Sequence, residues 1–159
     1  MILLDQKRIY RTLNRMAFQI LEAAHSSNIQ FVGVNRRGLI VADALKKILD
    51  KETGKSVKVT NLHSNDDNQI EISKIEPTEL LVVVDDVIFS GETGFNVIQR
   101  ISNLSDFESI ILAVLVDRGH RKYPLLAEVV GIHVPTKLNE QVNLHVQDNE
   151  PEKVVLTNK

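Results

Sequence analysis

The chain has 159 residues, of which 43% are hydrophobic and 25% are charged, and it contains no cysteine. A disordered chain would be less hydrophobic and more highly charged, so we expect a single folded domain over residues 1–159. The missing cysteines exclude disulfides, thiol nucleophiles and thiolate metal sites. A net charge of -2 disfavours general binding to nucleic acid. With no bilayer-length apolar run and no signal-peptide pattern, we expect no membrane partner and a cytoplasmic location.

Helical and strand patterns alternate along the chain. A helix capped by Asp5 is expected to run to about Ser26, because its apolar residues recur three and four positions apart. Five-residue apolar runs such as Leu80–Val84 predict strands buried on both faces. The remaining predicted strands are 31–34, 57–60, 110–116, 129–134 and 142–146, and the remaining helices are 38–50 and 94–101.

Strands that alternate with helices predict an α/β fold with a mainly parallel, twisted sheet flanked by helices. The more alternating C-terminal strands suit a sheet edge and are expected to form a small hood. Residues 61–77 break the pattern as a polar, acidic loop, and residues 148–159 have the composition of a polar tail. In such folds ligands bind beyond the C-terminal ends of the strands, so we expect the ligand-binding residues in the segments that follow the strands.

The strongest motif follows the strand 80–84. Asp85 and Asp86 come first, and Ser90, Gly91 and Thr93 lie in a turn that opens a helix. Backbone amides of such a turn and the positive end of the helix dipole suit a phosphate dianion. Two adjacent carboxylates suit a pair of ribose hydroxyls. Each piece alone also occurs in ordinary strand–turn–helix connections, but the complete run predicts a site for a sugar 5-phosphate.

Two sequence runs resemble a known family. LVVVDDVIFSGET at 81–93 resembles the phosphoribosyl diphosphate (PRPP) binding motif of type I phosphoribosyltransferases. LAVLVDRGHR at 112–121, followed by VPT at 134–136, resembles the pyrimidine operon attenuation regulator/uracil phosphoribosyltransferase family. The resemblance covers nearly the whole chain. It implies transfer of phosphoribose from PRPP to a nucleobase, with uracil expected and a purine as the alternative, and release of pyrophosphate in nucleotide salvage.

The resemblance also implies roles for individual residues. Asp85 and Asp86 would bind the ribose hydroxyls and Arg37 the pyrophosphate, for which an arginine fork and a helix start are both suited, so these three are the catalytic candidates. The base pocket would contain Asp117, Arg118 and Val134. Mg²⁺ would be held through PRPP oxygens, with Asp85 as the candidate protein ligand, and not by a protein cage. The expected PRPP-binding residues are Asn35, Arg36, Arg37, Gly38, Asp85, Asp86, Val87, Ser90, Gly91, Glu92, Thr93 and Gly94.

Two departures from the family pattern leave an alternative function open. The segment 61–77 stands where the family has a longer flexible lid, and it carries Asp66, Asp67, Glu71 and Glu76 against one Lys74. Such a lid would close unfavourably over an anionic substrate, and Glu92 adds a further negative side chain beside the predicted phosphate site. The alternative is therefore a catalytically weak, nucleotide-sensing regulator.

That regulator would bind pyrimidine-operon RNA through Arg15, His120 and Arg121. Other positions of the family's RNA-binding face are Phe18, Leu126 and Ile132 here, which offer neither charge nor a hydrogen-bond donor. The resemblance also implies a homo-oligomer, a dimer or larger.

Overall fold

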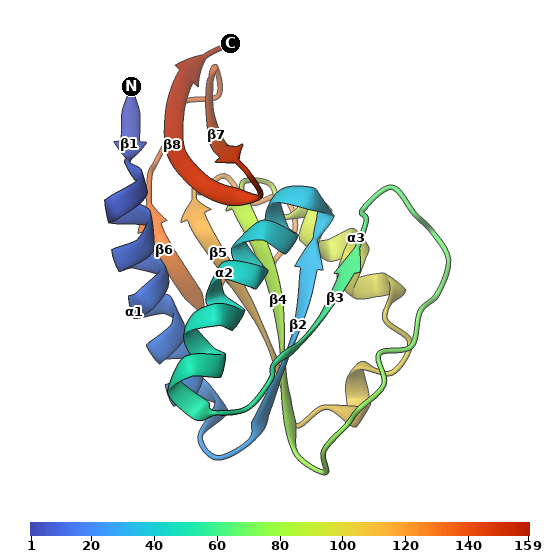
Figure 1. Ribbon diagram of the computed structural model, residues 1–159. Coiled ribbons are helices and arrows are strands. Elements are labelled where there is room, and N and C mark those ends of the chain that lie inside the picture. Colours follow the sequence, from blue (N-terminus) through green and yellow to red (C-terminus); the bar gives the residue numbers. More distant parts are fainter.

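The computed structural model describes residues 1–159 and contains two β-sheets flanked by helices (Figure 1). In the larger sheet five strands follow the order β3-β2-β4-β5-β6, and every neighbouring pair is parallel. This confirms the predicted α/β fold. The strands of this sheet are β2 (Asn28–Val34), β3 (Lys58–Leu62), β4 (Glu79–Ile88), β5 (Ser109–Asp117) and β6 (Val129–His133).

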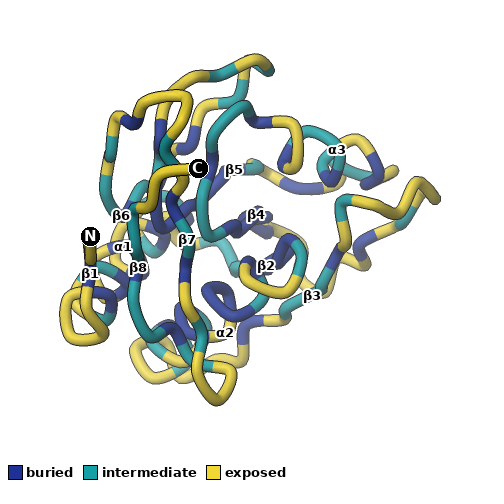
Figure 2. Tube along the Cα trace, turned by 90° about the horizontal axis from the view of Figure 1, so that it is seen from above, coloured by how far each residue is buried: buried dark blue, intermediate teal, exposed yellow.

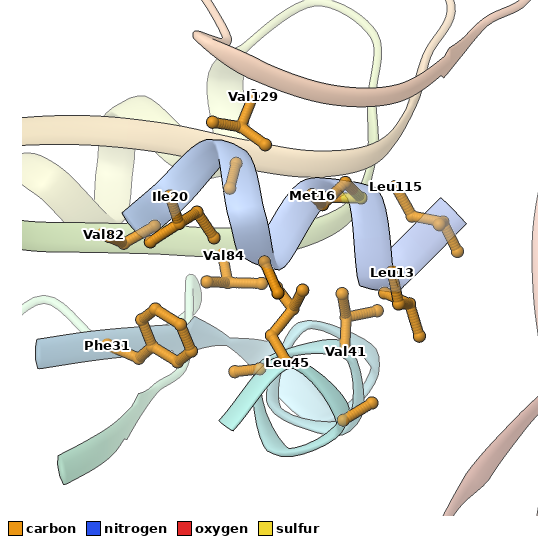
Figure 3. Close-up of a cluster of buried hydrophobic side chains, with 14 of the residues drawn as sticks. Leu13, Met16, Ile20, Phe31, Val41, Leu45, Val82, Val84, Leu115 and Val129 are labelled. Carbon is orange, nitrogen blue, oxygen red and sulfur yellow. The ribbon is translucent and has the colours of Figure 1, made fainter. Parts of the chain in front are cut away.

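Helices cover both faces of the parallel sheet. α1 (Gln6–Ala24) and α2 (Asn35–Thr53) pack on one face, while α3 (Glu92–Arg100) and a short 3₁₀ helix (Leu104–Asp106) lie on the other. No helix is both long and apolar enough to cross a membrane. Figure 3 shows side chains of the larger apolar cluster: Leu13, Met16, Ile20, Val41, Leu45, Phe31, Val82, Val84, Leu115 and Val129.

The helix bounds are explained by local chemistry. The Asp5 carboxylate accepts a hydrogen bond from the Arg8 amide at 2.9 Å and caps α1, as predicted. α2 begins at Asn35, earlier than predicted, directly after β2. β4 runs through Asp85 and Asp86 to Ile88, so the two acids lie within the strand and not after it. Successive strand residues point to opposite faces, which makes the two acids structurally different.

The second sheet is the predicted hood. It is antiparallel, has the order β1-β8-β7, and lies beyond the C-terminal ends of β2 and β4 (Figure 1). The prediction of a tail at 148–159 is wrong, because β8 is the central strand of the hood. Asp148 and Asn149 have φ of 53° and 59° and form the tight turn that returns the chain from β7 to β8. The hood strands are β1 (Ile2–Leu4), β7 (Glu140–Gln147) and β8 (Glu150–Asn158).

Much of the predicted lid at 61–77 is fixed. Residues 61 and 62 complete β3, and the segment then runs along the α3 side of the sheet (Figures 1 and 2). Ile70 forms a β-bridge with Ile101, and Ile72 is 2% exposed with its amide bonded to Asn103 Oδ1 at 2.9 Å. Arg100 donates to the carbonyls of His63 and Asn68 at 2.6 and 2.9 Å. The predicted lid at 61–77 is therefore anchored to the sheet and to α3 at several points between residues 61 and 72, and its role as a lid stays a prediction.

A small polar network fastens the hood to the helices. Glu150, at the start of β8, accepts hydrogen bonds from the Tyr10 hydroxyl of α1 at 2.6 Å and from Lys47 Nζ of α2 at 2.5 Å. The bonds from Lys47 and Tyr10 lower the pKa of Glu150. Burial, followed by the bond to Glu150 and its charge, raises the pKa of Tyr10 to about 12. The hood thus has an ionic attachment at its hairpin.

Replacing Glu150 tests this attachment. Because the pKa of Glu150 is depressed in the folded state, its contribution is present above its unfolded pKa and lost as the pH falls through the folded value. The pair is substantially exposed to solvent, so Glu150→Gln should cost about 0.5–1 kcal/mol at pH 7. Urea unfolding at pH 7 and pH 3 measures this, with exposed Glu128→Gln as control. An equal loss at both pH values would contradict the ionic attachment.

Candidate active site

Two adjoining cavities lie at the C-terminal ends of the parallel strands. The larger, of about 370 Å³, is lined by residues of α2, β4 and α3. The smaller, of about 180 Å³, is lined by the turn between β4 and α3. Asp85, Val87 and Thr93 border both cavities. Of the predicted PRPP-binding residues only Gly38 borders neither; those that do are Asn35, Arg36, Arg37, Asp85, Asp86, Val87, Ser90, Gly91, Glu92, Thr93 and Gly94.

The two helices that start at these cavities receive no side-chain cap from the residue that precedes them, although the Glu92 amide of α3 donates to Ser90 Oγ at 3.2 Å. α2 follows Val34 directly, and α3 follows Gly91, whose φ of 86° requires a residue tolerant of the left-handed region. α1, by contrast, is capped by the Asp5 side chain. The first amides of an α-helix have no partner within it, and with the helix dipole they favour an anion. Each cavity therefore has an anion-binding wall.

Gly38 explains how α2 reaches the carboxylates. A Cβ atom at this position would lie 2.7 Å from the Val84 carbonyl oxygen and 3.4 Å from Asp85 Oδ1. Only glycine lets the first turn of α2 pack so closely on β4. In this structure the contribution of Gly38 is the close approach of α2 to β4, and its predicted contact with PRPP stays a prediction.

The two carboxylates have different environments. Asp85 is 8% exposed, and its Oδ1 accepts the Asp86 amide at 2.9 Å. Burial raises the pKa of Asp85 well above its usual range, and the charge of Asp86 and its side-chain hydrogen bond raise it further. Asp86 is half-buried and borders only the larger cavity. Asp86 is therefore the more accessible hydrogen-bond acceptor, while Asp85 forms part of the wall between the cavities.

Two arginines stand opposite these acids at the start of α2. Arg36 and Arg37 are exposed and also border a neighbouring hollow of about 250 Å³ against the hood. Arg37 Nε donates to the Leu144 carbonyl of β7 at 3.0 Å, which leaves its terminal nitrogens for a ligand. Asn35, with φ of 56°, bonds through its side chain to the Ser64 amide and hydroxyl at 2.9 and 3.1 Å. The start of α2 is thereby bonded to β7 of the hood and to the segment that follows β3.

The donor set fits magnesium shared with a substrate. The protein has no cluster of three or more histidine or acidic side chains that could hold a metal alone. Asp85 and Asp86 border a cavity whose opposite wall suits a diphosphate. Mg²⁺ is commonly bound by one or two carboxylates together with substrate phosphate oxygens. These residues therefore suit a metal that arrives with a diphosphate.

The predicted base-pocket residues lie together but do not border either cavity. Asp117 ends β5, and its carbonyl accepts the Val134 amide at 2.9 Å. The Arg118 guanidinium stacks 4.2 Å from the Phe89 ring centroid and donates to Thr136 Oγ1 at 3.0 Å. Arg118 is thus an internal brace between Phe89 and Thr136.

The predicted RNA contacts have intramolecular partners. Arg15 donates to the carbonyls of Val130 and Gly131 on β6, and His120 Nε2 lies 2.6 Å from the Thr136 carbonyl oxygen. Arg121 forms an ion pair with Asp117 at 2.7 Å. Each of the three side chains thus has a hydrogen-bond partner within the fold, while Arg15 and His120 remain exposed at the surface.

Sequence reasoning missed two residues that shape the site. Phe89 contacts the Arg118 guanidinium and the His120 ring, and the centroids of the Phe89 and His120 rings are 5.6 Å apart. Arg100 holds the residues after β3 through its bond to the His63 carbonyl. An aromatic residue inside the motif was the only available signal for Phe89, and nothing distinguished Arg100 from a surface arginine. A further cavity of about 540 Å³, larger than both site cavities, lies at the opposite end of the sheet near Ser26, Lys55 and Glu79.

Solved phosphoribosyltransferases share this architecture. The hypoxanthine phosphoribosyltransferase of Trypanosoma cruzi superposes with a TM-score of 0.69 at 16% identity, covering 99% of this chain and 95% of that chain. A hypoxanthine-guanine phosphoribosyltransferase of Bacillus anthracis gives a TM-score of 0.65 at 16% identity, covering 98% and 96%. At such identities the likeness shows the fold alone.

Sequence comparison places the chain in a family. The model of the phosphoribosyl transferase domain matches residues 2–144. The Bifunctional protein PyrR of Clostridium acetobutylicum is 33% identical over 96% of this chain and 94% of its own length. That of Latilactobacillus sakei is 30% identical over 91% and 89%. The chain therefore belongs to the phosphoribosyl transferase family, in the group that contains the PyrR proteins.

Proposed function

We propose that this phosphoribosyltransferase transfers the phosphoribosyl group of PRPP to uracil and releases pyrophosphate, in nucleotide salvage. One observation carries the proposal: the larger cavity joins a carboxylate pair to an uncapped helix start with two arginines. The adjoining smaller cavity adds a second uncapped helix start. PRPP has a diol between a phosphate and a diphosphate, so it matches this order of groups.

Each part of PRPP has a place in the proposed complex. The 5-phosphate accepts hydrogen bonds from the amides of residues 91–94 and from the hydroxyls of Ser90 and Thr93. The ribose hydroxyls donate to Asp86, with Asp85 behind it. The pyrophosphate lies against the first turn of α2, where Arg36 and Arg37 supply positive charge. Mg²⁺, when bound, would offset further negative charge on the pyrophosphate.

The proposed reaction is a substitution at C1 of the ribose. A ring nitrogen of uracil forms a bond to C1, the bond from C1 to the pyrophosphate oxygen breaks, and the nitrogen loses its proton to solvent. Positive charge develops on the ribose and negative charge on the leaving pyrophosphate. Asp86 holds the ribose in place, while Arg36, Arg37 and the α2 amides stabilise the leaving group. No protein nucleophile is needed.

Uracil is proposed from the resemblance of the DRGHR and VPT motifs and from the PyrR relatives. A base that enters next to C1 would approach the ends of β5 and β6, where Asp117 and Val134 lie. A purine acceptor is the alternative that a direct assay decides. The homo-oligomeric state and the cytoplasmic location stay predictions.

The reaction itself can be measured directly. With PRPP, Mg²⁺ and a panel of pyrimidine and purine bases, we expect pyrophosphate release with uracil and little with the other bases. Release with a purine alone would reassign the acceptor. PRPP binding without release with any base would contradict the catalytic proposal, and salt-dependent retardation of pyrimidine-operon leader RNA would then support the regulatory alternative.

The different environments of the two acids lead to a second prediction. Asp86→Asn should lower kcat/KM for PRPP by about 10- to 100-fold, the cost of one charge-assisted hydrogen bond, with unchanged stability.

Asp85→Asn should also lose activity but raise the melting temperature at pH 7. The raised pKa of Asp85 means that its ionisation disfavours the folded state as the pH rises, so the stability gain should shrink toward pH 4. Calorimetric melting at both pH values measures this, and a destabilised Asp85→Asn would contradict it.

A further inference from the structure

The DRGHR segment, residues 117–121, packs against the phosphate turn, which we define as residues 89–91. Arg121 makes the central contacts, and its side chain is only 22% exposed. Its guanidinium donates to the Phe89 carbonyl at 2.9 Å through one terminal nitrogen and to Asp117 Oδ2 at 2.7 Å through the other. Nε donates to the Leu125 carbonyl at 3.0 Å. Every nitrogen of this side chain therefore has a partner inside the fold.

The backbone that follows Arg121 holds the same turn. The amides of Lys122 and Tyr123 both donate to the Ser90 carbonyl at 2.9 Å. A Cβ at Gly91 would contact the Tyr123 carbonyl oxygen at 3.4 Å and Arg121 Cδ at 3.6 Å. The carbonyls of the phosphate turn are thus directed onto this segment. The residues that open α3 line the smaller cavity, and the Glu92 amide donates to Ser90 Oγ at 3.2 Å.

The other end of the contact is the predicted base pocket. Besides the Arg121 bond, the Asp117 carboxylate accepts the Gly119 amide at 2.9 Å. Asp117 pairs in register with His133 of β6. The carboxylate is therefore held in one orientation at the C-terminal end of β5, and Arg121 spans the distance from there to the phosphate turn.

We propose that Arg121 is a positioning residue that fixes the phosphate turn relative to Asp117, so that the 5-phosphate and the base are aligned on one ribose. The proposal rests on the proposed function, since it concerns the geometry of that site. It gives Arg121 an internal role in place of the predicted RNA contact. The planar fork of arginine suits three acceptors in different directions, which the single ammonium of lysine does not.

Three variants test the proposal. Arg121→Gln removes the guanidinium fork, and Arg121→Lys keeps the positive charge. Lys122→Gln is the matched control, because it removes one positive charge from an exposed neighbouring side chain. Calorimetric titration with PRPP and Mg²⁺ should show about tenfold weaker binding for Arg121→Gln, the cost of one charge-assisted hydrogen bond. Arg121→Lys should recover part of the affinity, and Lys122→Gln should bind as the unchanged protein does. Melting curves identify any variant that fails to fold, in which case Arg121→Lys carries the test.

The pH dependence of activity separates positioning from general stability. Burial raises the pKa of Asp117, but the Arg121 hydrogen bond, the Gly119 amide and the charges of Arg121 and His133 together lower it below its usual range. Without Arg121 the pKa should rise, so the acid limb of kcat/KM for the base should move to higher pH. The same limb should stay in place for Lys122→Gln.

The outcomes distinguish the two proposals. If the unchanged protein does not bind PRPP, the proposed function fails and the role of Arg121 fails with it. If the unchanged protein and Arg121→Gln bind PRPP equally, only the positioning role is overturned. An equal loss in Lys122→Gln would also overturn it, because the effect would then be one of net charge. Loss of RNA retardation in Arg121→Gln with unchanged PRPP affinity would assign the side chain to RNA instead.

Discussion

The site must attract a highly anionic substrate to a protein whose net charge is -2, and it must do so beside two carboxylates. The positive potential therefore has to be local. Two uncapped helix starts and two arginines supply it, and Gly38 brings one of those helix starts against the strand that carries the acids. The remaining features of the site, including the buried state of Asp85, follow from this close packing of α2 on β4.

The site is bordered by different structures on its two sides: the hood on the α2 side and the segment after β3 on the α3 side. On the α2 side, Arg37 reaches the hood at Leu144, and Glu150 fastens the hood to both neighbouring helices. On the α3 side, Arg100 and Asn103 hold the polar segment along the sheet. The hood and the segment after β3 are thus each attached to the parallel-sheet body by side-chain hydrogen bonds.

The sequence predicted the elements with strong periodicity and missed those that depend on distant partners. The strand at 80–84 and the capped helix after Asp5 were recognisable because apolar spacing and capping are local. β8 was missed because its polar residues pair with β7 and β1, and the turn at Asp148 and Asn149 was the only local signal. The apolar Ile70 and Ile72 hinted that the lid was not free, but their partners Ile101 and Asn103 lie about 30 residues away in the chain.

The PRPP motif was predictable for a similar reason. Its residues are contiguous, so one strand–turn–helix unit assembles them. The different environments of Asp85 and Asp86 could not be predicted in this way, because the strand continues past both acids and turns them to opposite faces. The DRGHR segment was interpreted through its charge, whereas its side chains bond to carbonyls that no sequence pattern marks. Basic residues in a motif thus indicated a polyanion, while the fold uses them to brace backbone.

The position of Arg15 has a consequence for how copies of this protein can assemble. By occupying the carbonyls of Val130 and Gly131, it blocks part of the outermost strand β6 against pairing with an added strand. Two molecules could not readily join their parallel sheets into one continuous sheet across that border. The restriction applies to the β6 edge alone, because β3 forms the opposite edge of the sheet and has no such arginine contact.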